Sequence, residues 1–551
     1  MNAMEIHFLG AAQVVTGSNI LIETKSSRML IDCGLFQGSN ELEALNRKPF
    51  TYDPASINYL FLTHAHVDHS ARIPLLVKEG FKGKIFTTRA TKDLAEIMLL
   101  DSAHIQQNDA QWTNRKRERA GEPPIEPLYT VKDAEESLRY FQPVLYGQKI
   151  VIDHHISIRF RDAGHILGSA ILELWITEPN GGQVPDTVKL VFSGDLGMPD
   201  KPLIRDPEII EEADYLIMES TYGDRTHEQV SDRMNMLMDA INRTLQRGGT
   251  VIIPSFAVGR TQELIYELNR YFGASNEMDL FRKTPVYIDS PMAVSATEIF
   301  KRNAHSFDDE TKALILKGDN PLSFDNLHFV RDHQESVKLN TATHPKIIIS
   351  ASGMCTAGRV RHHLKHHLWD PKSTVIFVGY QAQGTLGRLL KDGIKKVKLL
   401  GEEIAVKAEM VSIDGFSGHA DQPALLHWLQ GFSKKPKKVF LVHGEPEASQ
   451  ALASLIWEQH GIPVEVPAVG YAFEMEEAVL KADSAEMLLP VQRKENIKRE
   501  LEQVYRQIES LVPQTERLLD EEMLKKDYDA LKNKLIDLQQ ELIALGMLLG
   551  E

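Results

Sequence analysis

Four potential metal ligands lie within six residues of the sequence, in Thr63-His64-Ala65-His66-Val67-Asp68-His69. Neutral imidazole and carboxylate are the nitrogen and oxygen ligands that zinc takes from proteins. Because residues two apart in an extended segment point the same way, His64 and His66 can bind one ion from the same side. Asp68 and His69 then turn towards a second ion. The cluster therefore predicts a zinc centre.

Two further polar residues could complete this centre from a distance. His165 stands in Asp162-Ala-Gly-His165 and Asp195 in Ser193-Gly-Asp195, each after a strand-like run and beside a glycine. Each also has an ordinary explanation, because a lone histidine is often a hydrogen-bonded structural residue and an aspartate in Ser-Gly-Asp often forms a turn. Taken singly, these residues leave their roles open.

The elements that must position the cluster follow from hydrophobic patterning. Short strand-like runs (MEIHFLG, SNILIET, RMLIDCG, INYLFLT) precede the histidines, and similar runs return between about residues 150 and 220. Between about 223 and 403, strands such as TVIIPSF and KIIISAS alternate with helical runs, which is typical of parallel βαβ units. Strands of the first kind are expected to resume after 403. The pattern predicts one domain interrupted by another.

The last segment, residues 484–551, has a different pattern. Leucine, isoleucine and valine recur every three or four residues on both sides of Pro513, which predicts a helical hairpin or a coiled-coil tail. A helix pair packed on its own chain and a homo-oligomer interface both fit this pattern.

The composition is that of an ordinary globular protein, with 42% hydrophobic and 25% charged residues. No apolar run approaches the roughly 20 residues of a membrane-spanning helix, and the start lacks the pattern of a secretory signal, so we expect a cytoplasmic protein without a membrane partner. Cys33 and Cys355 form neither a disulfide framework nor a Cys-x-x-Cys pair. The net charge of −15 argues against nucleic acid unless bound zinc offsets the carboxylates at the site.

The metal-binding pattern resembles that of the metallo-β-lactamase superfamily. His64-x-His66-x-Asp68-His69 is followed by Gly164-His165 and Ser193-Gly-Asp195, and Asp32 in Leu30-Ile-Asp32-Cys-Gly34 matches the first acidic motif. The resemblance implies an α/β fold, the αββα sandwich, in which His64, His66 and His165 bind one zinc and Asp68 and His69 the other. It also implies that Asp195 bridges both ions and that Asp32 orients a ligand.

The inserted segment and three further motifs resemble the β-CASP nucleases. Glu219 in IMESTYG, His419 in GFSGHAD and His443 in LVHGE resemble the family's motifs A, B and C. The likeness covers residues 4 to about 480 and points to bacterial and archaeal relatives of the endonuclease subunit of the eukaryotic cleavage and polyadenylation factor. It implies that His443 completes the second zinc site and favours RNA, and that the catalytic residues are Asp68, His419, Glu219 and Asp32.

The resemblance also implies an organisation and an activity. We expect a metallo-β-lactamase domain at 1–222 and 404–483, an inserted parallel-sheet β-CASP domain at 223–403 and a helical tail at 484–551. The expected function is a ribonuclease with two Zn²⁺ per chain that acts as an endonuclease in RNA processing or decay, and the sequence leaves open whether it is also a 5′-3′ exonuclease. The alternatives are a zinc hydrolase of small esters or lactams with the insertion as a lid, a DNA nuclease of the same family, and an inactive binding protein.

Three strand-to-helix turns rich in small residues could contact the RNA backbone. Helix N-termini present free N–H groups to anions, and arginines add charge-assisted hydrogen bonds, although glycine in such a turn is often structural. The expected phosphate-binding residues are Ser255 and Arg260 in the first turn, Ser350, Ser352, Gly353 and Arg359 in the second, and Gln381 in the third.

Overall fold

The computed structural model describes residues 4–178, 186–227, 230–275, 280–379, 381, 384–413 and 416–475. The helical tail predicted for residues 484–551 lies outside these ranges. None of the helices in the described ranges combines the length and the apolar character needed to cross a bilayer.

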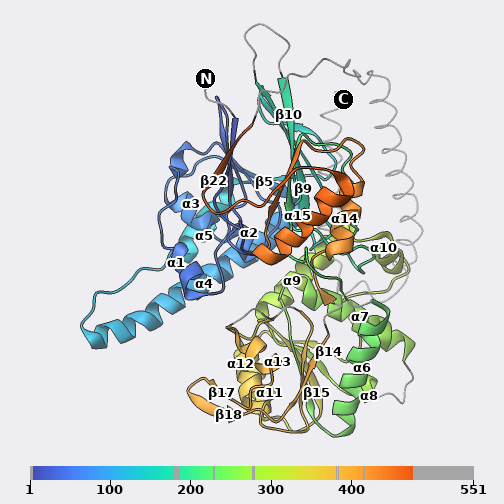
Figure 1. Cartoon of the computed structure of the whole chain (residues 1–551). Helices are drawn as coiled ribbons and strands as arrows, with labels where there is room; N and C mark the ends of the chain where they lie inside the picture. The colour runs from blue at the N-terminus through green and yellow to red at the C-terminus, as the bar shows by residue number, and fades with distance from the viewer. Residues whose placement is uncertain are drawn as a thin grey trace, which may run out of the picture. The chain divides into compact units, whose positions relative to one another are not determined.

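Two seven-stranded sheets form the first domain (Figure 1). The first sheet has the order β22 (Tyr471–Met475), β1 (Met4–Phe8), β2 (Ile20–Glu23), β3 (Arg28–Ile31), β4 (Tyr59–Phe61), β5 (Lys84–Thr88), β6 (Phe141–Val144). The second has the order β21 (Val464–Glu465), β20 (Lys438–Val442), β11 (Tyr215–Glu219), β10 (Asp186–Phe192), β9 (Ala170–Glu178), β8 (Ile156–Asp162), β7 (Ile150–Val151).

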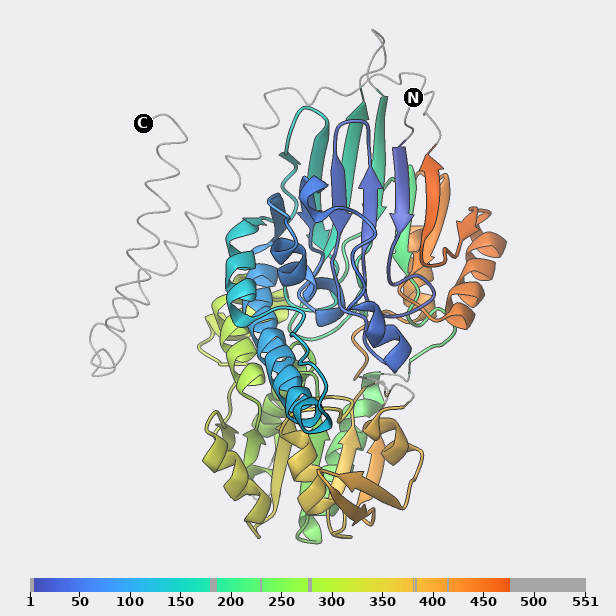
Figure 2. The same ribbon diagram turned by 90° about the vertical axis from the view of Figure 1, so that its left-hand side faces the viewer.

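The inner faces of the two sheets pack against each other as adjacent layers (Figure 2). Alternating side chains such as Phe8, Phe61, Phe160, Leu172 and Phe440 fill the space between them, as strand periodicity requires. Helices cover the outer faces, so the predicted αββα sandwich is confirmed. The helices packed on the first sheet include α3 (Ile73–Lys78), α4 (Arg89–Ala120) and α5 (Val131–Ser137); those on the second are α14 (Gln422–Gln430) and α15 (Pro446–His460).

The chain completes this sandwich after a long interruption, as the strand pattern predicts. Strand β20 pairs in parallel with β11, and β22 pairs with β1, so segments more than 200 residues apart share each sheet. Short helices complete the loops of the sandwich: α1 (Asn40–Leu45), α2 (Val67–Ser70) and the 3₁₀ turns η1 (Pro54–Ser56) and η2 (Leu138–Tyr140).

The inserted domain is built on a six-stranded sheet in which every pairing is parallel. Its order is β14 (Leu327–Phe329), β13 (Val286–Ile288), β15 (Lys346–Ser350), β12 (Thr250–Pro254), β16 (Thr374–Phe377), β19 (Glu409–Ser412). Strands β12 and β15 are buried at every residue, which explains their continuous apolar sequences. Around the sheet lie α6 (Val230–Gln246), α7 (Arg260–Ala274), α8 (Leu280–Lys283), α9 (Pro291–Arg302), η3 (Ala304–Ser306), α10 (Asp309–Leu316), α11 (His333–Thr341), α12 (Val360–His367) and α13 (Leu386–Lys391).

One boundary differs from the expectation. We expected the inserted domain to end at residue 403, but β18 (Glu402–Ala405) pairs with β17 (Lys396–Leu399), and β19 forms the edge of the parallel sheet. The inserted sheet therefore continues to Ser412. Alternating apolar residues mark a strand but do not say which sheet it joins.

Candidate metal centre

The structure brings all seven expected metal ligands together at one end of the sandwich. They come from loops that follow strands or from the short helix α2, where side chains can converge without disturbing the sheets. His64 and His66 follow β4, Asp68 and His69 lie in α2, and His165, Asp195 and His443 follow β8, β10 and β20.

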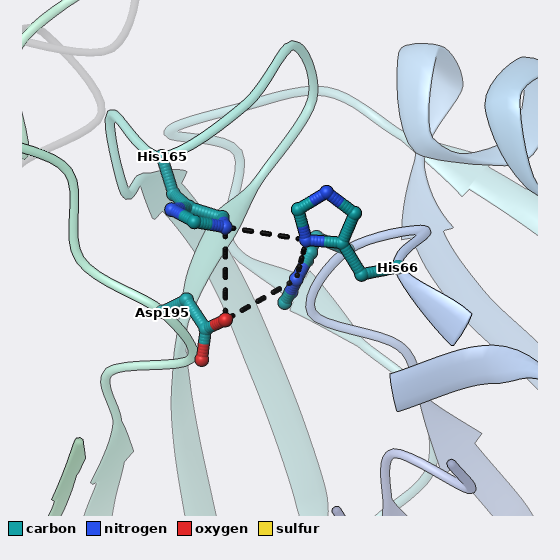
Figure 3. A group of neighbouring side chains, drawn as sticks. His66, His165 and Asp195 are labelled. Carbon is teal, nitrogen blue, oxygen red and sulfur yellow. Dashed lines mark hydrogen bonds and ion pairs between the residues drawn. The ribbon is translucent and has the colours of Figure 1, made fainter. Parts of the chain in front are cut away.

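The first ligand group consists of His64, His66, His165 and Asp195. His66 Nδ1 lies 3.0 Å from His64 Nε2 and 3.2 Å from His165 Nε2, and Asp195 Oδ2 lies 3.4 Å and 3.6 Å from the same two Nε2 atoms. Figure 3 shows His66, His165 and Asp195 pointing towards one another. Around a tetrahedral zinc with bonds of about 2.0–2.1 Å, neighbouring ligand atoms lie about 3.3–3.4 Å apart. The group therefore has the spacing of a single tetrahedral ion.

A second ligand group lies beside the first and consists of Asp68, His69 and His443. His443 Nε2 lies 3.2 Å from His69 Nε2 and 3.4 Å from Asp68 Oδ2. Asp195 Oδ1 lies 3.4 Å from His69 Nε2, so the two carboxylate oxygens of Asp195 face different groups. This arrangement fits a carboxylate shared by two ions.

The side chain of Asp195 gives a test of whether a metal fits. Its Oδ1 atom is buried and has no hydrogen-bond partner among the described residues. An unpaired buried carboxylate oxygen is costly, and a cation removes that cost. A cavity of about 20 Å³ borders Asp195, His69 and His443 on the side of the apolar core, where residues such as Phe192 and Ile217 line it. The donor set and the open oxygen therefore suit metal ions.

The protonation of the cluster also suits a metal. Burial, with repulsion from neighbouring imidazoles, holds the pKa of His64 and His165 well below the usual range and lowers that of His66 to about 4. Burial alone would raise the pKa of Asp195, but the attraction of His443 and His69 lowers it well below its usual value. His64, His66 and His165 are therefore neutral and Asp195 is ionised, the forms in which these groups bind metals. His69 differs, because the attraction of Asp195 and Asp32 outweighs its burial and raises its pKa well above the usual range.

Outer contacts fix the orientation of the ligands. His69 Nδ1 donates to Asp32 Oδ2 at 2.7 Å, which directs its Nε2 towards the metal cluster. His165 Nδ1 donates to the Gly418 carbonyl at 3.2 Å. Asp32 is 2% exposed and also accepts from the backbone N–H of Thr63. Asp32, expected among the catalytic residues, is thus buried behind His69 and is a positioning residue.

His419 and Glu219 form a pair at the edge of the metal cluster. His419 Nδ1 donates to Glu219 Oε2 at 3.1 Å, while Glu219 is 1% exposed and the side chain of His419 is 21% exposed. Burial lowers the pKa of His419, but the attraction of Glu219 and Asp195 outweighs this effect and raises it. Because Nδ1 faces Glu219, the partly exposed ring leaves Nε2 for a substrate.

Asp162 lies beneath the loop that carries His165 and gives a prediction about stability. Its Oδ1 accepts the N–H of Gly164 at 3.0 Å, and burial raises its pKa to about 7. Between pH 4 and 7 the unfolded chain loses this proton while the folded chain keeps it, so stability falls as the pH rises through that window.

We expect Asp162→Asn to remove this fall in stability with rising pH, because asparagine does not titrate. Relative to the wild type, the free energy of unfolding of the variant should rise by roughly 2 kcal/mol between pH 5 and pH 8. Urea unfolding of both metal-free proteins at the two pH values measures the change. A constant difference between the two proteins across this range would contradict the prediction.

The chain is similar in sequence to known protein families. Three family profiles match: the metallo-beta-lactamase superfamily at residues 12–134, the Beta-Casp domain at 261–390 and the Zn-dependent metallo-hydrolase RNA specificity domain at 403–467. The chain is 38% identical over 453 residues to Ribonuclease TTHA0252 of Thermus thermophilus, covering 82% of this chain and 96% of that protein. The chain belongs to the β-CASP family of metallo-β-lactamase-fold proteins.

Other β-CASP relatives carry different names. Transcription termination factor FttA of Methanosarcina mazei is 32% identical over 466 residues, covering 82% of this chain and 68% of that protein. An RNase J-like protein of Methanocaldococcus jannaschii is 30% identical over 469 residues, covering 84% and 98%. Each similarity spans the sandwich and the β-CASP domain.

The three turns expected to bind phosphate gather at one edge of the β-CASP sheet. They follow β15, β12 and β16, which are neighbours, so their carboxyl ends meet. Ser255 and Ser350 are each 1% exposed, and Gln381 is 3% exposed and donates to the Gly353 carbonyl at 3.0 Å. These three residues shape the turns from inside, which corrects the expectation that they meet RNA directly.

The two arginines of these turns also bond within the protein. Arg359 donates to Asp289 at 2.6 Å and to the backbone carbonyls of Val330 and Arg331. Its guanidinium therefore ties the second turn together, and a phosphate contact from Arg359 stays a prediction. Arg260 donates to Glu263 at 2.5 Å. RNA contacts from Ser352 and Arg260 stay predictions. Gly353 packs beside the ring of Phe256.

The sequence did not reveal Lys201 as a site residue. Lys201 Nζ donates at 3.2 Å to the Gly418 carbonyl, which also accepts from His165. Burial lowers the pKa of Lys201 to about 7. The attraction of Glu263 raises this pKa in part, and the repulsion of Arg260 lowers it further. A single lysine six residues after Asp195 has no sequence signal, because only the fold places it beside Gly418.

Proposed function

We propose that this chain is a zinc-dependent ribonuclease that hydrolyses RNA phosphodiester bonds with two zinc ions. The observation that carries the proposal is the pair of ligand groups sharing Asp195, at distances suited to tetrahedral coordination. Relatives named as a ribonuclease and as RNase J-like, and a matched profile described as an RNA specificity domain, support RNA as the substrate.

His64, His66, His165 and Asp195 would hold one zinc, and Asp68, His69 and His443 would hold the other with Asp195 between them. When bound, zinc lowers the pKa of water towards neutrality and stabilises negative charge on phosphoryl oxygens. Asp32, Thr221 and the Gly418 carbonyl keep the ligand rings aimed at the cluster, because each contacts the ring nitrogen that faces away from it.

His419 and Glu219 supply the proton transfer in this proposal. His419 holds a proton at Nε2 and gives it to the departing 3′ oxygen of the cleaved bond, acting as a general acid. Glu219 accepts from Nδ1, which fixes the ring and stabilises its protonated form. The products would carry 5′-phosphate and 3′-hydroxyl ends.

Metal removal tests this function. We expect chelator-treated protein to lose cleavage of end-labelled single-stranded RNA, and two equivalents of zinc per chain to restore it, because the ligand groups predict two sites. Substrates with a 5′-phosphate and with a blocked 5′ end separate exonuclease from endonuclease products. A lactam substrate and single-stranded DNA serve as parallel controls. Full RNA cleavage by metal-free protein would refute the proposal.

A further inference from the structure

The turn between β12 and α7 exposes an aromatic side chain. Phe256 follows Ser255 at the carboxyl edge of the β-CASP sheet and is 44% exposed. Among the described residues it is the one phenylalanine that is exposed, whereas the others lie in the cores or are partly covered. An exposed phenylalanine is not unusual by itself, so its position decides whether it has a function.

This turn lies directly against the metal centre. A Cβ atom on Gly259 would lie 2.9 Å from Ile166 Cγ2, and Ile166 follows His165 in the sequence. A Cβ atom on Gly418 would lie 3.1 Å from His165 Cε1 and 4.0 Å from Arg260 NH2. Gly259 and Arg260 thus lie against the loops that hold and contact His165, so the turn 255–260 that carries Phe256 is next to the metal centre.

The backbone of Phe256 is held rigidly. Its carbonyl accepts from Thr261 Oγ1 at 2.7 Å and from the Thr261 N–H at 3.2 Å. A Cβ atom on Gly353 would lie 3.1 Å and 3.2 Å from Cδ2 and Cε2, so Gly353 packs against one edge of the ring. An aromatic ring fixed at its base and packed along one edge is a ready surface for another flat ring.

We propose that Phe256 is a stacking platform for a nucleobase of single-stranded RNA next to the cleaved phosphodiester. The inference rests on the ribonuclease function proposed above. Stacking on an aromatic side chain accepts any base, whereas bases in a duplex are already stacked on each other.

The charges of the protein favour such a contact. The net charge is −15, and Arg359, Ser255 and Ser350 are engaged in bonds within the protein. Phosphate contacts from lysine and arginine supply most of the affinity of typical nucleic-acid-binding proteins. Stacking on Phe256 would supply affinity that does not depend on charge.

Substitutions of Phe256 test the platform. Phe256→Ala should raise the KM for single-stranded RNA about tenfold and leave kcat and the zinc content unchanged, because a stacked base is lost. Phe256→Trp should keep the wild-type KM, whereas Phe256→Leu should raise the KM as Phe256→Ala does. Trp369→Ala is the matched control, because Trp369 is 56% exposed and precedes β16 at the opposite edge of the sheet.

A series of RNAs with one abasic position each locates the stacked base. In the wild type, one abasic position near the cleaved bond should raise KM about tenfold, and the same position should have no further effect in Phe256→Ala. Equal abasic sensitivity in both proteins, or an unchanged KM in Phe256→Ala, would overturn the inference while cleavage still upholds the ribonuclease function.

Binding separates the two proposals if cleavage fails. The same RNAs can be bound to zinc-loaded His419→Ala protein, with and without Phe256→Ala, and Kd measured by fluorescence anisotropy. If the zinc-loaded wild-type protein cuts no RNA, a Kd that depends on Phe256 would uphold the platform and refute the nuclease. A Kd independent of Phe256 would refute the platform.

Discussion

Asp195→Asn is expected to abolish RNA cleavage and metal binding together. Asp195 Oδ2 faces His64 and His165, while Oδ1 faces His69, so this residue joins the two ligand groups. An asparagine keeps one oxygen but replaces the other with an NH₂ group, which cannot bind a cation. Loss of a shared ligand should reduce the cleavage rate by at least about a thousandfold.

Elemental analysis and single-turnover cleavage of labelled RNA measure the two effects. Asp162→Asn is the matched control, because it makes the same change at a buried aspartate that contacts Gly164 and lies outside both ligand groups. The control should keep two zinc ions and its activity. An Asp195→Asn protein with two zinc ions and a normal rate would show that Asp195 does not bridge the metals.

Much of this centre could be predicted from the sequence, because zinc accepts few kinds of side chain. His64, His66, Asp68 and His69 lie so close in sequence that local geometry already brings them together, and the ordered motifs supplied His165, Asp195 and His443. The sandwich was predictable for a similar reason, since strands that bury one face alternate apolar and polar residues.

The parts that could not be predicted depend on tertiary contacts. A serine in a glycine-rich turn reads as a phosphate ligand, yet Ser350 is buried and donates to the backbone carbonyl of Asp289. Arg359 also reads as a phosphate ligand in the sequence, but in the fold its guanidinium donates a hydrogen bond to Asp289. Strand β19 was assigned to the wrong sheet because strand pairing is set by neighbours distant in sequence. Burial in the fold decides whether a polar side chain contacts substrate or supports a loop. The spacing of residues in the sequence does not reveal which side chains become buried.

His419→Ala should separate proton transfer from metal binding. We expect the variant to keep two zinc ions and to lose cleavage by about 10²–10⁴-fold, the usual contribution of a general acid. The reason is geometric: His419 Nδ1 is bonded to Glu219, whereas the ligand groups of the first and second ions are complete without His419.

Glu219→Gln and His427→Ala complete the experiment. Glu219→Gln keeps a hydrogen-bond acceptor but removes the charge that stabilises the protonated ring, so its loss of rate should be smaller than that of His419→Ala. His427→Ala changes an exposed histidine on α14 and should leave the rate unchanged.

The zinc content decides between two roles for His419. His419 Nδ1 lies 3.9 Å from Asp195 Oδ2, and His419, His443 and Asp195 together could also hold an ion. If His419→Ala loses one zinc with its activity, His419 is a ligand and the proton must come from another group. If zinc is kept and only the rate falls, Glu219 and His419 act on the leaving oxygen, because a residue that merely supports the fold would affect both measurements.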